Sequence, residues 1–166
     1  MDHRAHFTLL ADYGLWANRR LIVGLEPLSD ADWHADQGLF FKSIHLTLNH
    51  DLVVEQLWLG RLAGEPWRGG SLAEPRDATR AGLIDQLLAQ GAKVRAAMQA
   101  LPDPLPARIQ YLTTDGAPMD VPFAPVLAHV FNHGTHHRGQ VTAAAQRLGL
   151  TVQELDIPYF LADAKL

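Results

Sequence analysis

A cluster of histidines near the carboxyl end of the chain is the feature of this sequence that most directly suggests chemistry. The chain contains nine histidines among its 166 residues, so about half a histidine is expected in any window of nine. One such window instead holds four: His129, His133, His136 and His137. Imidazole nitrogens are common ligands of divalent metals, and this clustering therefore indicates a metal site.

Helical spacing limits which of these histidines can share one ion. Residues four apart lie about one turn apart on the same face of a helix, so the pair His133 and His137 can share an ion, and so can His129 and His133. His129 and His137 are about 12 Å apart along the axis, too far for bonds of about 2 Å to one metal. His133 belongs to either pair, and the spacing leaves both pairs open.

A pair of histidines is incomplete, because catalytic metal sites usually keep three protein ligands and one open position. The third ligand must come from another helix, where His45 and His50 are the candidates, with Asp51 and Glu55 as oxygen donors. His50 lies on the flank of an apolar stripe and can reach the interior of a helical protein. His45 follows directly on Ile44 near the helix start and is expected to be more peripheral.

Four long amphipathic segments must position these residues. Apolar periodicity and capping residues predict helices over 4–25, 43–64, 77–101 and 125–148. A short helical turn is predicted at 29–34, a loop at 64–75, and a last turn from Pro158. Two short runs around Asp115-Gly116 predict a hairpin within 108–123. We therefore expect one all-α domain over 1–166, a four-helix bundle with a small β-hairpin insert before the last long helix and room for a crossover in its second connection.

Composition and missing motifs exclude several classes of function. The chain has no cysteine and a formal net charge of −4, which excludes disulfides and thiolate nucleophiles and argues against non-specific nucleic-acid binding. Charged residues interrupt the first apolar segment, so we expect neither a signal peptide nor a membrane partner, and a cytoplasmic location follows by elimination. The Glu-x-x-His pairs of di-iron bundles, phosphate-binding loops and nucleophile elbows are also absent.

One stretch around the histidines resembles the signature of a known family. Residues 132–140 read Asn-His-Gly-Thr-His-His-Arg-Gly-Gln, and the Asn-His-x-x-x-His-Arg-Gly-Gln signature of the DinB family can be followed in them. Looser matches occur at 12–18, in the first helix, and from 43 to 50, in the second. The chain thus resembles the DinB family over nearly its whole length.

The resemblance implies a metal site made by His50, His133 and His137. It also implies a DinB/YfiT-like four-helix fold, a homodimer, and zinc or nickel as the metal, although imidazole ligands suit iron and manganese too. Some related groups use a low-molecular-weight thiol as a cofactor in transferase or isomerase reactions. DNA binding is not implied.

The sequence therefore predicts a divalent-metal-dependent enzyme acting on a small-molecule substrate, either a small-thiol-dependent transferase or isomerase, or a hydrolase. The alternative is a non-catalytic metal-binding protein of a stress or damage response. His129 and His136 are expected to support the site or to pack beside it. Arg138 and Gln140 are expected to orient the helix or a dimer contact, or to lie on a solvated or salt-bridged helix face.

Overall fold

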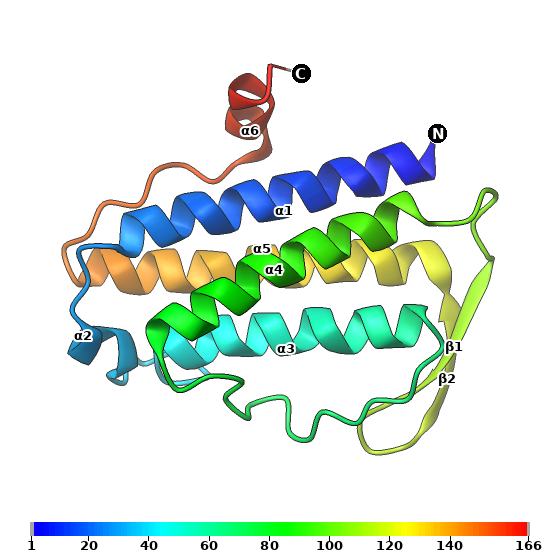
Figure 1. Ribbon diagram of the computed structural model, residues 1–166, viewed down its shortest axis with the longest axis horizontal. Helices are drawn as coiled ribbons and strands as arrows, with labels where there is room; N and C mark the ends of the chain where they lie inside the picture. Colours follow the sequence, from blue (N-terminus) through cyan, green and yellow to red (C-terminus); the bar gives the residue numbers. More distant parts are fainter. Residues whose placement is uncertain (1, 166) are drawn as a thin grey trace.

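The computed structural model describes residues 2–165, which form a mostly helical protein with one small hairpin (Figure 1). Its elements in order are α1 (His3–Leu25), α2 (Asp30–His34), α3 (Ile44–Leu62), α4 (Arg80–Gln99), β1 (Arg108–Leu112), β2 (Pro118–Pro122), α5 (Phe123–Arg147) and α6 (Ile157–Asp163). The strands pair antiparallel, with Ile109 opposite Val121. The predicted all-α class with a β-hairpin before the last long helix is confirmed.

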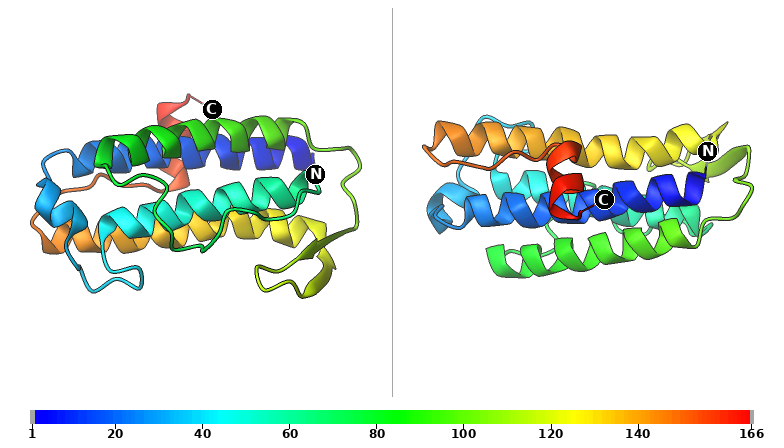
Figure 2. Two further views of the ribbon diagram at one scale, coloured as in Figure 1. Left: turned by 60° about the horizontal axis from the view of Figure 1, so that its bottom comes forward. Right: turned by 90° about the horizontal axis from the view of Figure 1, so that it is seen from above.

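The four long helices pack side by side in a ring. Helix α1 contacts α4 and α5, and α3 contacts the same two helices from the other side (Figures 1 and 2). Helices α3 and α4 run in the same direction, opposite to α1 and α5 (Figure 1). Because α3 and α4 are parallel neighbours, residues 63–79 must return along roughly 28 Å of helix, the rise of the 19 residues of α3. This segment is the crossover for which the sequence left room, and we call it the crossover segment.

Local capping explains where the helices begin. The Ser43 side chain accepts a hydrogen bond from the Leu46 amide at the start of α3, as its N-cap position predicts. Thr79 caps α4 in the same way, so α4 begins at Arg80 rather than at residue 77. Helix α5 begins at Phe123, two residues before the predicted start, because the Phe123 amide closes the hairpin by donating to the Ala107 carbonyl.

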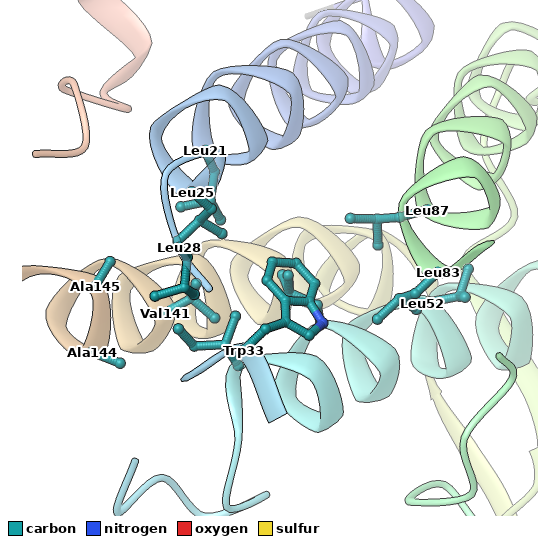
Figure 3. Close-up of a cluster of buried hydrophobic side chains, with 12 residues drawn as sticks. Leu21, Leu25, Leu28, Trp33, Leu52, Leu83, Leu87, Val141, Ala144 and Ala145 are labelled. Atoms are coloured by element: carbon teal, nitrogen blue, oxygen red, sulfur yellow. The ribbon is translucent and has the colours of Figure 1, made fainter. Parts of the chain in front are cut away.

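The two largest apolar clusters of the interior lie at opposite ends of the helices. The first contains Trp33, which is fully buried among leucines of α1, α3 and α4 and residues of α5 (Figure 3). The second lies at the hairpin end and joins Phe7, Met98 and Leu127 to Ile109 of β1. Between the two clusters the helices carry buried polar side chains: Asn18, Asp51, Gln90 and Arg138. We call this level of the interior the polar layer.

Among residues 2–165, no helix combines the length and the apolar character needed to cross a lipid bilayer.

We expect Leu52→Ala to lower the free energy of unfolding by about 2–5 kcal/mol, since it leaves a cavity in the first cluster, where Leu52 is fully buried. Urea denaturation measures the change. Val23→Ala is the control, because Val23 is 61% exposed, and should cost less than about 0.5 kcal/mol. Equal losses in the two variants would contradict the placement of this cluster.

Candidate metal centre

Three histidine side chains from two adjacent helices meet at one point. His50 projects from α3, and His133 and His137 project from successive turns of α5. The Nε2 atom of His133 lies 3.3 Å from Nε2 of His50 and 3.2 Å from Nε2 of His137. One ligand atom from each residue can be chosen so that all three lie within 4.8 Å of one another. The packing of α3 against α5 thus brings together the three residues that the family resemblance implied.

The outer nitrogen of each ring faces a hydrogen-bond acceptor. Nδ1 of His50 donates to the Leu72 carbonyl of the crossover segment at 3.1 Å, and a carbonyl can only accept. Nδ1 of His137 lies 2.8 Å from Oε1 of Gln140. Nδ1 of His133 faces Oδ1 of Asp51 at 3.4 Å. A proton on each Nδ1 would satisfy all three acceptors and would leave the lone pair of each Nε2 directed toward the common point.

The donor set and its spacing fit a divalent metal. Two of the three Nε2 pairs lie 3.2 and 3.3 Å apart, and lone pairs at such distances repel one another unless a cation or a proton lies between them. Tetrahedral coordination with metal–nitrogen bonds of 2.0–2.1 Å places neighbouring nitrogens about 3.3–3.4 Å apart, close to the observed 3.2 and 3.3 Å. Neutral imidazoles that donate their other N–H to protein acceptors are the usual form of histidine ligands.

The surroundings of His50 and His137 favour the neutral form of both rings. The pKa of His137 is lowered to about 4, chiefly by burial and also by the neighbouring His133, while Asp51 acts in the opposite direction. Burial likewise lowers the pKa of His50. Because metal ligands must be deprotonated, this direction of shift favours metal binding near neutral pH.

An aromatic side chain covers one side of the centre. Phe41, in the loop before α3, stacks on the ring of His50 with centroids 3.9 Å apart and an interplanar angle of 21°. The same phenyl ring meets His137 edge-on at 5.8 Å. Phe41 therefore restrains two of the three imidazoles and limits access from its side. Sequence periodicity did not single it out, because it lies in an irregular loop.

His45 was the alternative to His50, and the structure gives it a different role. Its Nδ1 accepts a hydrogen bond from Trp33 Nε1 at 2.8 Å, and its Nε2 donates to the Asp77 carbonyl at 2.9 Å. Both nitrogens are occupied, and the residue is 3% exposed. The expectation that His45 is peripheral was wrong, since it ties α2 and the end of the crossover segment to α3.

Asp51 and Glu55, the two carboxylates considered as oxygen donors, both lie on α3. Asp51 is 1% exposed and holds the outer face of His133. Glu55, one turn further along α3, has its pKa raised to about 8 by burial and by the charge of Asp51, with a smaller opposite effect from Arg138. Neither belongs to the three-residue ligand group within the described part of the chain.

Arg138 of the signature lies in the polar layer, so the prediction of a solvated or salt-bridged helix face was wrong for this residue. It is 4% exposed, and its Nη2 donates to Thr135 Oγ1 at 3.0 Å and its Nη1 to Asn18 Oδ1 at 3.4 Å. Gly134 makes room for it, because a Cβ there would lie 3.0 Å from Nη1 and 3.5 Å from Oδ1 of Asp51. The four-residue spacing of Gly134 and Arg138 was the signal available in the sequence.

The remaining histidines of the cluster stay outside the ligand group. His129 is exposed, and its ring meets the rings of Trp58 and His133 edge-on, with centroids 5.5 and 5.7 Å away. His136 is also exposed, 5.1 Å from the ring of His137. Of the two pairs that helical spacing allowed, the pair that converges with His50 is therefore His133 and His137.

The fold and the three-histidine group together fit those of a helical metal-binding protein. The DinB family model matches residues 1–164, and the chain belongs to the DinB family. The chain is 24% identical over 157 residues to "Protein DinB" of Bacillus subtilis (strain 168), and the aligned region covers 92% of this chain and 91% of that protein. No solved structure matches the chain.

Glu55 generates a prediction for the dependence of stability on pH. The unfolded chain releases the Glu55 proton near pH 4.5, whereas the folded protein holds it up to about pH 8. Its contribution to stability is therefore present below 4.5 and is lost as the pH rises toward 8. We expect Glu55→Gln to gain stability relative to the parent protein over this interval, as measured by urea denaturation at a series of pH values. A difference that stays constant with pH would contradict the assignment, and the exposed Glu65→Gln serves as the control.

Proposed function

We propose that this protein is a metal-dependent enzyme that holds one divalent ion through His50, His133 and His137 and acts on a small-molecule substrate. The observation that carries the proposal is the convergence of three Nε2 atoms whose outer nitrogens all face acceptors. Three protein ligands leave one position of a tetrahedral site for a substrate or water, which is the pattern of catalytic rather than structural sites. Zinc or nickel is the proposed metal, and iron or manganese would suit the same ligands.

A divalent ion with three neutral ligands keeps its full charge, and when bound it supplies Lewis-acid chemistry that lowers the pKa of a water or thiol placed beside it. The residues of the chain orient the ligands for this chemistry. Asp51 holds His133, and Gln140 holds His137 from the same helix. The crossover segment holds His50 through the Leu72 carbonyl.

Two reaction types follow from what the chain itself lacks. It has no cysteine, so a transferase or isomerase that uses a thiol must take it from a low-molecular-weight cofactor. Hydrolysis of a small substrate needs no such cofactor. The resemblance to thiol-dependent groups of the family supports the first type, and the open coordination position suits both.

The second candidate is a metal-binding protein of a stress or damage response without catalysis. The position of Phe41 favours it, because a phenyl ring stacked on His50 narrows the approach to the ion. For either candidate function, we propose that the protein is a cytoplasmic homodimer without nucleic-acid or membrane partners. Sedimentation measures the oligomeric state.

We expect protein purified without an affinity tag to carry one divalent ion per chain, measured by elemental analysis. His50→Ala or His137→Ala should weaken zinc binding by at least about 100-fold, since each removes a ligand, and Asp51→Asn should weaken it by about 10- to 100-fold through His133. Competition with a chromogenic chelator gives the affinities.

His136→Ala is the matched control, because its ring neighbours His137 on the same helix but lies outside the ligand group. It should bind zinc like the parent protein. Equal binding by His50→Ala and the parent protein would refute the metal centre.

The open coordination position can be tested by replacing the native ion with Co²⁺ and adding 2-mercaptoethanol. A thiol that reaches the ion should produce a new sulfur-to-cobalt absorption band, because a coordinated thiol deprotonates. We expect Phe41→Ala to lower the thiol concentration needed for half of the change. A spectrum that does not respond to thiol in either protein would favour the non-catalytic candidate.

A further inference from the structure

A recess lies outside the three-histidine group, between the end of α3, the beginning of the crossover segment and the hairpin. Its volume is about 710 Å³, and none of its lining residues is a histidine. Small-molecule sites usually occupy about 300–1,000 Å³ and have mainly apolar walls with a few polar groups. We call this recess the hairpin cleft.

The walls of the hairpin cleft are largely apolar and aromatic. Trp67 of the crossover segment and Tyr111, Leu112 and Met119 of the hairpin all line it. Leu112 is 56% exposed and Met119 is 37% exposed, so both leave apolar surface in water. A ligand with an apolar portion would remove that surface from water, which is favourable.

Arg61 supplies the positive charge of the hairpin cleft, and it is the one basic residue among the described residues that line it. Its guanidinium lies over the rings of Trp58 and Tyr111, at 4.5 and 4.3 Å, and Nη2 donates to the Leu112 carbonyl at 3.1 Å. Burial lowers its pKa. The cation is thus held in place by two rings and a carbonyl, and a nearby anion would offset its lost hydration.

The two acidic residues of the lining compete little with such an anion. Asp120 is already paired, since Arg108 Nε lies 2.7 Å from its Oδ1. Glu65 is exposed to water, where its interaction with other charges is screened. Arg61 is therefore the charge that a bound ligand meets in the partly desolvated part of the cleft.

We propose that the hairpin cleft binds a small amphipathic organic anion, with its apolar portion against Leu112, Met119 and Trp67 and its acidic group toward Arg61. This assignment is independent of the metal centre. The size of the recess suits a compact molecule rather than a macromolecule.

The probes for the test are 8-anilinonaphthalene-1-sulfonate, an aromatic anion, and N-phenyl-1-naphthylamine, which has the same rings without the charge. Fluorescence titration of the folded protein gives both affinities. Arg61→Met should weaken binding of the anion about fivefold or more, because it removes a charge-assisted contact, and should change binding of the neutral probe less than twofold. Equal affinity of the anion for the parent protein and Arg61→Met would overturn the role of Arg61.

A second variant keeps the test informative if Arg61→Met loosens the rings around it. Leu112→Asn changes an exposed wall residue and should weaken both probes at least about threefold. Val23→Asn is the matched control, because Val23 is a similarly exposed apolar residue on α1, and it should leave both affinities unchanged. Circular dichroism and melting temperature confirm that each variant is folded. Unchanged binding of both probes by Leu112→Asn would overturn the proposal. Conversion of a dimer to a monomer by this variant alone would also overturn it and would make the cleft a subunit interface.

Discussion

The convergence of three imidazole lone pairs on one point is the constraint on which the rest of the structure depends. Two contacts between Nε2 atoms, at 3.2 and 3.3 Å, require a cation or a shared proton between them, and other interactions hold the rings in place. The restraints come from three separate parts of the chain: a carbonyl of the crossover segment, a carboxylate of α3 and an amide of α5. The crossover segment therefore does more than join two parallel helices, because it sets the orientation of His50 from outside the helical core.

The polar layer shows how the fold accommodates this centre. Apolar clusters lie on either side of the level at which Asn18, Asp51 and Arg138 are buried. Burying polar groups is costly unless they are paired, and Oδ2 of Asp51 and Nε of Arg138 are buried without a hydrogen-bond partner among the described residues. A uniformly apolar interior would avoid this cost, but it would leave His133 without an acceptor for its outer nitrogen. The inner faces of α1, α3 and α5 thus carry polar side chains at one level, and Asp51 links this level to the three-histidine group through His133.

Local sequence patterns were enough to predict the long helices and the hairpin. Helical spacing limited the partner of His133 to His129 or His137, since residues four apart on a helix are neighbours whatever surrounds them, but it did not choose between them. Local patterns did not identify the third ligand. His45 and His50 lie five positions apart on one helix, and helical geometry left both available. The distinction comes from segments that are remote in sequence, because Trp33 and Asp77 occupy both nitrogens of His45, whereas Leu72 occupies one nitrogen of His50. The family resemblance favoured His50, but the spacing alone could not. The burial of Arg138 was missed for the same kind of reason, since it depends on Asn18 of a distant helix and on the space above Gly134.

The hairpin lies at the surface, but Trp58 connects it to the histidines of α5. Trp58 of α3, which is 7% exposed, meets the ring of Tyr111 at 5.2 Å and that of His129 at 5.5 Å, and His129 in turn meets His133. One indole therefore separates the hairpin cleft from the histidine cluster. Since a buried indole in a close-packed setting has little room to move, Trp58 keeps the hairpin cleft and the three-histidine group apart. The hairpin cleft is lined by Arg61 and apolar side chains, whereas the three-histidine group presents imidazole nitrogens. This division follows from the position of the hairpin immediately before α5, because Tyr111 of β1 packs against Trp58 of α3, and the same indole packs against His129 of α5.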